Sequence, residues 1–195
     1  MTGSEASTVV VGFTGASGAP IAVAVLKALH AAHVPVQLIV SAGGELVLRE
    51  ECDLSIEDLR PYVDAVLGEK DFTARVASGS SPTRGMVIVP CSANTLAKVA
   101  HGFADNLIAR AAHVHLKEHR PLILVPRETP LSVFTLRNMT LLTEAGALLL
   151  VASPPYYLRA TKVEQLVDYL AGKVLDHLGV PHSLYRGWKS GETSK

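Results

Sequence analysis

The sequence alternates short, continuous apolar runs with longer stretches of helical apolar spacing, and this alternation limits the possible folds more than any other feature. Five runs have the length and the β-branched or aliphatic composition of buried strands. They are residues 8–13, 36–40, 86–89, 122–125 and 147–151. A strand with one exposed face alternates apolar with polar residues, so these unbroken runs indicate a parallel sheet that is covered by helices on both faces.

Helical patterns follow the runs and complete the expected order of elements. They are residues 21–29, a stretch that ends at residue 50, a segment that starts at residue 93, residues 133–145 and residues 163–178. Strand, helix and parallel strand in this order form the βαβ unit. The expected fold class is therefore α/β, a single-domain doubly wound parallel sheet of the Rossmann-like or flavodoxin-like kind.

We expect one domain over residues 1–181, followed by a polar C-terminal tail over residues 182–195. A chain of 195 residues is long enough for one well-buried core and too short for two. Residues 54–75 are more polar, and we interpret them as a short helix and an irregular stretch. The tail carries an aromatic patch that either folds onto the domain or frays. Its members are Tyr185, Arg186 and Trp188.

Charge and composition exclude several classes of partner. The chain has 18 basic and 18 acidic residues, so it lacks a general positive field for nucleic acid or anionic lipid. No apolar run reaches the roughly 18–20 residues that a membrane helix needs, although the mean hydropathy of +0.28 is high for a soluble monomer. We therefore expect subunit interfaces to cover the surplus apolar surface. Two separated cysteines and no recognisable signal peptide favour the cytoplasm.

Ligands of a doubly wound sheet bind outside the carboxyl ends of its strands, so the residues that follow each run are the candidate site. Gly15, Ala16, Ser17 and Gly18 follow the first run and open a helix, an arrangement that suits a phosphate. The glycine spacing is not G-x-G-x-x-G and no acidic residue ends the second run, which disfavours an ordinary NAD site. The alternative is a glycine turn that serves packing alone.

Polar residues also follow the third and fourth runs. Ser92, Asn94 and Thr95 place hydroxyl and amide groups at a helix start, although Ser92 also suits an ordinary N-cap. Arg127 and Glu128 stand between two prolines after the fourth run, and a carboxylate beside a guanidinium suits acid–base chemistry on an anion.

Arg110 and Lys117 lie seven residues apart and so share a helix face. That face is either solvated or a second phosphate clamp.

Two other kinds of site are disfavoured. Residues 15–19 depart from the G-x-S-x-G nucleophile elbow at the last position, where the chain has alanine. His113 and His115 point to different faces of a helix, and His30 and His33 lack a third ligand nearby, so we expect no metal site.

Several strand-end motifs together resemble the UbiX-type flavin prenyltransferases. The motifs are Thr14-Gly15-Ala16-Ser17-Gly18, Ser78-Gly79-Ser80, Pro90-Cys91-Ser92, residues 105–112, Leu116-Lys117-Glu118 and Val125-Pro126-Arg127-Glu128-Thr129-Pro130. The resemblance extends to Tyr157 and the last helix and so covers nearly the whole chain, and the segment 125–130 is its most specific part.

This resemblance implies a homododecamer that joins a dimethylallyl group from dimethylallyl monophosphate to reduced FMN, without a metal. The product, prenylated FMN, serves UbiD-type decarboxylases. The implied FMN-binding residues are Gly15, Ala16, Ser17, Ser41, Ser92, Ala93, Asn94, Thr95 and Arg127. The residues implied around the allylic phosphate are Arg110, Lys117, Glu128, Tyr157 and Lys173, and the implied catalytic residues are Glu128, Ser17 and Glu51.

Two further functions are weighed against this one. The turn at residues 90–95 also resembles that of flavin-dependent cysteine decarboxylases, but their Pro-x-Met-Asn segment is missing here. A non-catalytic FMN-binding subunit of a decarboxylase would need the FMN residues without Glu128 or the phosphate clamp. The chain also departs from the prenyltransferase pattern at Ala42, where the family often has lysine, and at residues 158–160, where a His-x-Pro sequence is common.

Overall fold

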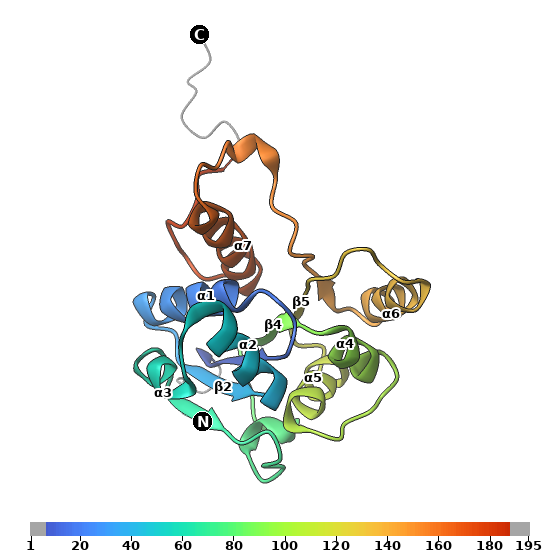
Figure 1. Cartoon of the computed structure of the whole chain (residues 1–195). Coiled ribbons are helices and arrows are strands. Elements are labelled where there is room, and N and C mark those ends of the chain that lie inside the picture. The colour runs from blue at the N-terminus through green and yellow to red at the C-terminus, as the bar shows by residue number, and fades with distance from the viewer. Residues whose placement is uncertain (1–6, 188–195) are drawn as a thin grey trace.

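The computed structural model describes residues 7–187 and contains one six-stranded sheet in which every strand is parallel to its neighbours (Figure 1). The strands are β1 Val9–Phe13, β2 Val36–Val40, β3 Ala65–Leu67, β4 Gly85–Cys91, β5 Leu122–Pro126 and β6 Leu148–Leu149. Their spatial order is β3-β2-β1-β4-β5-β6. This is the Rossmann-like order, in which the direction of winding reverses between β1 and β4.

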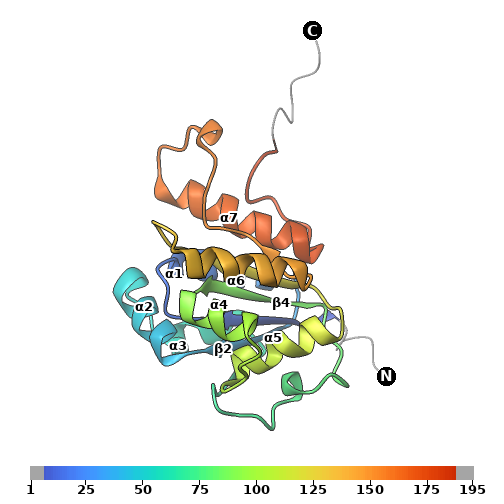
Figure 2. The same cartoon turned by 90° about the vertical axis from the view of Figure 1, so that its right-hand side faces the viewer.

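Helices cover both faces of the sheet (Figures 1 and 2). They are α1 Ala19–Ala31, α2 Ala42–Cys52, α3 Ile56–Leu59, α4 Ala93–Ala100, α5 Leu107–Lys117, α6 Val133–Glu144 and α7 Val163–Leu178, with 3-10 turns η2 Arg60–Tyr62, η3 Arg75–Ala77 and η4 Tyr156–Leu158. Helices α1, α2 and α7 lie on one face, and α4, α5 and α6 lie on the other. Within residues 7–187, no helix has both the length and the apolar composition to cross a bilayer.

The central strand β1 shows why the apolar runs are continuous. Val9, Val11 and Phe13 pack into the core under α1 and α7, whereas Val10 packs into the core under α4 and α5. All four side chains are fully buried. Because successive side chains of a strand point to opposite faces, a strand between two helical layers needs apolar residues at every position.

The predicted α/β class, the parallel doubly wound sheet and the five predicted strands are confirmed, with shifts at the strand ends. The last run is shorter than predicted, because only Leu148–Leu149 pairs with β5. The interpretation of residues 54–75 was wrong at one point, because Ala65–Leu67 forms the edge strand β3 beside β2. With three half-buried residues, β3 is too short to show a strand pattern in the sequence.

The segment after α7 folds back onto that helix. The Tyr185 and Tyr169 rings lie 4.8 Å apart, and Tyr185 and His182 both hydrogen-bond to Asp176. A Cβ atom at Gly172 would lie 2.6 Å from the Tyr185 ring, so glycine permits this close approach. Trp188 lies outside the described residues, and the boundary between a domain and a tail at residue 181 stays a prediction.

One histidine is part of the core. His115 on α5 is 1% exposed, its Nδ1 donates to the Ala111 carbonyl at 2.7 Å, and its Nε2 accepts from the Thr83 hydroxyl at 2.8 Å. Burial lowers the pKa of His115, and the charge of Arg120 lowers it further, although the Ala111 hydrogen bond acts in the opposite direction. The folded state therefore prefers the neutral imidazole.

We predict that His115 makes the fold sensitive to mild acid. Its contribution to stability is intact above the unfolded pKa of about 6.5 and is lost as the pH falls below that value, because the unfolded chain binds the proton more readily. Urea unfolding of His115→Gln should show a smaller difference in free energy between about pH 7.5 and about pH 5.5 than the wild type does. The same substitution at exposed His177 is the control. If the free energy of unfolding of His115→Gln changed between the two pH values as much as that of the wild type, the prediction would be contradicted.

Candidate functional site

A buried threonine joins the two strands at which the winding of the sheet reverses. Thr14, which follows β1, is 3% exposed. Its hydroxyl donates to the Pro90 carbonyl at 2.8 Å and accepts from the Ser92 backbone N–H, also at 2.8 Å. These bonds tie the turn after β1 to the turn after β4, so the two loops that border the crevice are held in one fixed arrangement.

Glycines let the start of α2 approach the turn after β1. A Cβ atom at Gly15 would lie 3.0 Å from the Gly43 Cα, and one at Gly44 would lie 2.5 Å from the Phe13 carbonyl oxygen. Gly18 has a φ of 128°, a conformation that side chains other than glycine rarely adopt. Close packing therefore explains glycine at position 15, and backbone conformation explains it at position 18, whatever ligand the turn binds.

The carboxylate of Glu51, at the end of α2, lies at the N-terminus of α1. It accepts hydrogen bonds from the backbone N–H groups of Gly18 and Ala19, both at 2.9 Å. Burial by itself would raise the pKa of Glu51, but hydrogen bonds from Ser17, Gly18 and Ala19 and the charge of Arg127 hold it below its usual range. Two predicted site residues, Ser17 and Glu51, thus come together, and a third, Arg127, is near enough for its charge to act on Glu51.

This arrangement changes the interpretation of the turn after β1. The sequence predicts a phosphate at the N-terminus of α1, but two of the N–H groups there already bind Glu51. A negative charge at this position is stabilised by the helix dipole, as a phosphate would be. A ligand phosphate must therefore displace Glu51 or bind at another helix start on the same edge.

Ser41 and Ser92 cap the helices α2 and α4. The Ser41 hydroxyl accepts from the Gly44 N–H at 3.1 Å, and the Ser92 hydroxyl accepts from the Thr95 N–H at 3.2 Å and donates to the Thr95 hydroxyl at 3.0 Å. The N-cap expected for Ser92 is confirmed. Thr95 is buried, whereas Ala93 and Asn94 are exposed at the start of α4. Both serines lie next to the crevice even though each has a structural partner.

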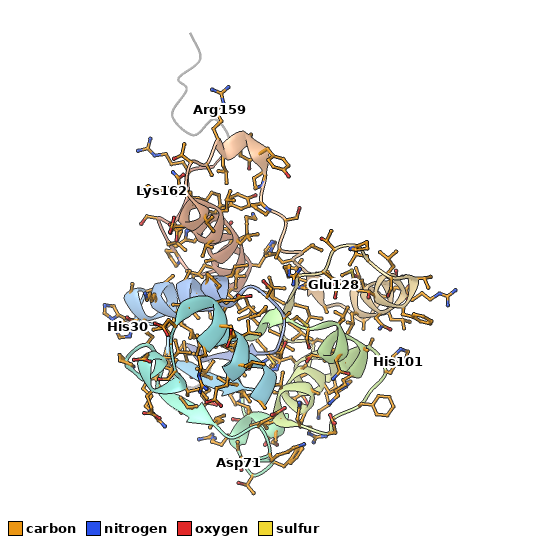
Figure 3. All side chains as sticks on the ribbon, viewed as in Figure 1. His30, Asp71, His101, Glu128, Arg159 and Lys162 are labelled. Carbon is orange, nitrogen blue, oxygen red and sulfur yellow. The ribbon has the colours of Figure 1, made fainter. Side chains whose placement is uncertain are left out.

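Arg127 and Glu128 follow β5 and are both exposed. Glu128 is labelled in Figure 3. Arg127 lies near enough to Glu51 for its charge to lower that carboxyl's pKa. Within residues 7–187, the Glu128 carboxylate has no hydrogen-bond or ion-pair partner. An unpaired carboxylate at the carboxyl edge of the sheet is available to a ligand.

Arg110 lies in the first turn of α5 near this edge, whereas Lys117 at the end of α5 does not join the group within one chain. Arg110 Nε donates to the Ala77 carbonyl at 2.9 Å, and Lys117 pairs with Glu118 at 3.0 Å. Lys117 ends α5 before β5 begins, whereas Glu128 follows the end of β5. In one molecule, Lys117 therefore lies at the amino ends of the strands and Glu128 lies at their carboxyl ends.

Tyr157 and Lys173 belong to a third group, on and beside α7. Tyr157 is 46% exposed, and its hydrogen bond to Tyr169, together with burial, raises the pKa of the Tyr169 hydroxyl. Lys173 pairs with Asp176 at 3.1 Å, and this contact raises the pKa of the Lys173 ammonium. Tyr157 thus has a partner that the sequence did not indicate, whereas Lys173 pairs with a residue one helical turn away.

Glu69 and Asn106 are residues of this edge that the sequence analysis missed. Asn106 is buried, caps α5 by accepting from the Ala109 N–H at 2.9 Å and donates to Glu69 at 2.8 Å. The other Glu69 carboxylate oxygen accepts from the Ala42 N–H at 3.4 Å. Glu69 therefore connects the starts of α2 and α5. Asn106 fits an N-cap pattern before a helical run, but no sequence signal marks Glu69 as its partner.

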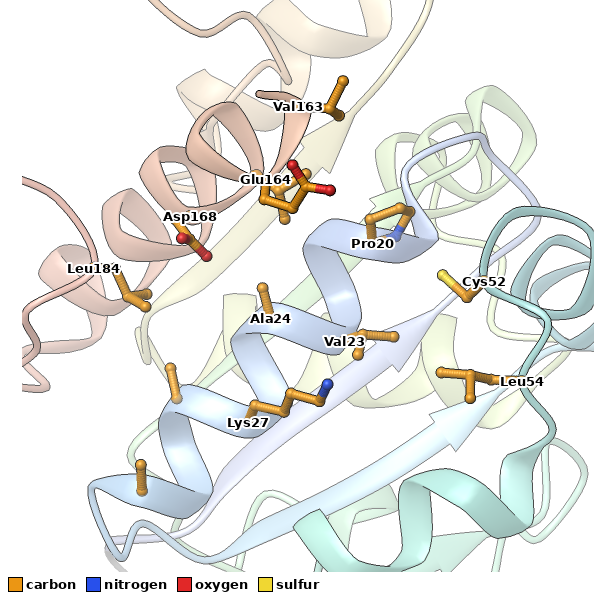
Figure 4. Close-up of a pocket in the computed structure, with 13 residues that line it drawn as sticks. Pro20, Val23, Ala24, Lys27, Cys52, Leu54, Val163, Glu164, Asp168 and Leu184 are labelled. Atoms are coloured by element: carbon orange, nitrogen blue, oxygen red, sulfur yellow. The ribbon is translucent and has the colours of Figure 1, made fainter. Parts of the chain in front are cut away.

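A cavity of about 630 Å³ runs along α1, between α7 on one side and the end of α2 on the other (Figure 4). Its lining is mainly apolar, with Val23, Ala24, Leu54, Val167 and Leu184 among its members. Of the predicted site residues, none lines it. We therefore place the candidate site at the carboxyl edge of the sheet.

Sequence comparisons identify several similar proteins. The chain matches the family described as Flavoprotein over residues 2–175. It is 46% identical over 183 residues to the flavin prenyltransferase UbiX of Deinococcus radiodurans, with 94% of each chain covered. It is 43% identical over 182 residues to the flavin prenyltransferase LpdB of Lactiplantibacillus plantarum, with 93% of this chain and 97% of that one covered.

Solved structures are similar over the same length. AnUbiX (PadA1), crystallised with FMN and dimethylallyl pyrophosphate, has a TM-score of 0.92 and 40% identity, with 95% of this chain and 98% of that one covered. A dodecameric FMN-dependent UbiX-like decarboxylase from Escherichia coli O157:H7 has a TM-score of 0.91 and 38% identity. The match covers 94% of this chain and 100% of that one. The peptidyl-cysteine decarboxylase EpiD, at 18% identity and a TM-score of 0.59, shares the fold alone.

We predict that Glu51 stabilises the start of α1 through its charge. Glu51→Gln should lower the free energy of unfolding near pH 7 by up to about 1 kcal/mol, because the amide lacks the charge that the helix dipole and Arg127 favour. Since the folded pKa of Glu51 is lowered, this contribution is present above the unfolded pKa and disappears as the pH falls through the folded one.

Urea unfolding at neutral and at acid pH measures this effect, and Glu50→Gln is the matched control because Glu50 is the exposed neighbour. If Glu51→Gln and Glu50→Gln lowered the free energy of unfolding equally at neutral pH, the position of Glu51 at the start of α1 would be irrelevant to stability.

Proposed function

This chain belongs to the family of UbiX-type flavin prenyltransferases, and we propose that it joins the dimethylallyl group of dimethylallyl monophosphate to reduced FMN to make prenylated FMN. The observation that carries the proposal is that Ser17 and Glu51 meet at the start of α1, within reach of the charge of Arg127, while the neighbouring Glu128 has an unpaired carboxylate at the same edge of the sheet. A flavin carrier or a cofactor-holding subunit would not need this acid–base group.

The carboxyl edge of the sheet fits FMN in its chemistry. Three helices, α1, α2 and α4, begin at this edge after β1, β2 and β4, and helix starts favour phosphate. We propose that FMN is bound by the turn at residues 15–17, the capping serines Ser41 and Ser92 with residues 93–95, and Arg127. Hydroxyls and backbone N–H groups suit the polar atoms of the flavin and its ribityl chain, and Arg127 adds a positive charge. When bound, reduced FMN supplies nitrogen 5 and carbon 6 as the atoms that bond to the five-carbon unit.

We propose that the allylic phosphate is held by Arg110, Lys117, Glu128, Tyr157 and Lys173. Ionisation of the donor leaves negative charge on the departing phosphate, which cationic and hydrogen-bonding groups stabilise when water is excluded. Within one chain Lys117 lies at the amino ends of the strands, Glu128 lies at their carboxyl ends, and Tyr157 and Lys173 lie beside and on α7. We therefore propose that a neighbouring subunit contributes part of the clamp.

Glu128 is the proposed acid–base residue for the proton transfers that accompany ring closure. Within the described residues its carboxylate has no partner to neutralise it. Ser17 is bound to Glu51, so its hydroxyl is positioned by a carboxylate that can accept or return a proton. We propose that Ser17 and Glu51 form a second proton-transfer pair on the other side of the crevice.

The proposed reaction also suggests how the protein assembles and which enzymes receive its product. We propose a homododecamer, like the similar dodecameric structure, and a cytoplasmic location. We propose UbiD-type decarboxylases as the recipients of prenylated FMN. The cysteine decarboxylase alternative is disfavoured, because those enzymes share only the fold while prenyltransferases are 38–46% identical over most of the chain.

The first test is anaerobic incubation of the purified protein with reduced FMN and dimethylallyl monophosphate, followed by mass and absorbance spectra of the released flavin. We expect a flavin heavier by one five-carbon unit. A parallel reaction with dimethylallyl pyrophosphate distinguishes the two donors. Unmodified FMN with both donors would overturn the proposed reaction.

Replacement of the proposed acid–base group should slow the reaction without loss of flavin. We expect Glu128→Gln to lower the rate of prenylation by roughly a hundredfold, the usual size of a general acid–base contribution, while the Kd for FMN changes little. Glu50→Gln serves as the control for a lost carboxylate. An unchanged rate in Glu128→Gln would remove Glu128 from the proton transfers.

Loss of the proposed phosphate clamp should affect the donor and not the flavin. We expect Lys117→Ala to raise the KM for the donor by about tenfold, the cost of one charge-assisted hydrogen bond, with the Kd for FMN unchanged. Lys98→Ala is the control, because Lys98 on α4 pairs with Asp105 and has no proposed role. Equal effects of the two substitutions on KM would exclude Lys117 from the clamp.

A further inference from the structure

Helix α6 exposes several large apolar side chains, whereas two of the three side chains that it buries are polar. Val133, Phe134, Leu136 and Leu141 are 52%, 71%, 49% and 44% exposed. A surface helix normally has the opposite pattern, and an exposed apolar face of this kind marks an interaction site.

The inward face of α6 is buried, with Leu142 in the core beside two polar residues. Asn138 is 8% exposed, and its side-chain oxygen lies 3.0 Å from His101 Nε2. Thr135 is also buried, and the Ser132 hydroxyl caps the helix by accepting from the Thr135 N–H at 3.1 Å. The apolar outer face is therefore a property of the folded helix.

Helix α6 has protein on one side only. It packs on α4 and β6, and Figures 1 and 2 show it at the periphery of the molecule. The helix begins directly after the loop that carries Arg127 and Glu128.

The outer face also carries one charge of each sign. Residues 134, 137, 141 and 144 follow the spacing of a single helical stripe, so Arg137 and Glu144 flank Leu141. Both charged residues are exposed, and neither has an ion-pair partner among residues 7–187. A face with an apolar centre and two opposite, unpaired charges is complementary to itself when one copy is reversed.

We propose that the outer face of α6 binds the same face of a second copy of this chain, with the two helices antiparallel about a twofold axis. If the axis passes between residues 140 and 141, Arg137 of each copy faces Glu144 of the other, and the two Leu141 side chains meet near the centre. The inference deepens the proposed assembly and rests on it. It places a subunit boundary next to the loop that carries Arg127 and Glu128.

Charge reversal tests both the face and the orientation. Arg137→Glu and Glu144→Arg should each convert the wild-type assembly into smaller species in native mass spectrometry, because each creates two like-charge contacts across the axis. The double variant, Arg137→Glu with Glu144→Arg, should restore the assembly. Restoration is expected only if α6 faces its own copy in reverse; two disruptive single variants without restoration would overturn the antiparallel pairing.

The apolar centre is tested separately. Phe134→Asp should also give smaller species, whereas Phe103→Asp, at an exposed aromatic residue before α5, is the control. Circular dichroism checks that each variant is folded. If Phe134→Asp and both charge variants assemble like the wild type, α6 is not an interface and the proposal fails.

Cross-linking keeps the proposal testable if a charged variant fails to fold. Leu141→Cys in a Cys52→Ser background should form a disulfide-linked dimer under mild oxidation, whereas Thr143→Cys, on another part of the helix, should not. A dimer from both variants or from neither would contradict the proposed axis. Prenylation is assayed in parallel: a wild type that is monomeric but active would refute the interface and leave the proposed reaction standing.

Discussion

The hydroxyl of Thr14 is the interaction on which the arrangement of the site depends. It bonds simultaneously to the Pro90 carbonyl and the Ser92 N–H, and so joins the turns after β1 and β4. In a doubly wound sheet these two turns diverge to opposite faces, which opens a crevice between them. Because Thr14 is buried and both of its bonds are satisfied, the width of that crevice is set by the protein before any ligand binds.

Carboxylates at helix starts are the second organising feature. Glu51 binds the start of α1, and Glu69 connects the starts of α2 and α5. A helix start has free N–H groups and the positive end of the helix dipole. A side-chain carboxylate can accept hydrogen bonds from those N–H groups and is stabilised by the dipole where no ligand is bound. The same physics that predicts phosphate binding from the sequence therefore also allows an internal anion, and the choice between them requires the structure.

The proposed site is spread over surfaces that one chain does not bring together. Lys117 lies at the amino edge of the sheet, Glu128 at the carboxyl edge, and Lys173 on α7. The apolar outer face of α6 borders the loop that carries Glu128, and a mean hydropathy of +0.28 agrees with a molecule that buries more surface by association. Assembly and catalysis are therefore proposed to depend on the same surfaces.

The sequence by itself determined the α/β class, the parallel sheet, the Ser92 cap and the family, because buried strands, helix starts and strand-end motifs are local patterns. It did not determine β3, whose three residues are too few for a pattern, or the partners of Glu51 and Glu69. Those contacts join residues far apart in the chain, such as Glu51 to Gly18 and Asn106 to Glu69. Only the tertiary structure decided them, because hydrogen-bond partners are chosen by the packing of helices and strands in three dimensions and leave no periodic trace in the sequence.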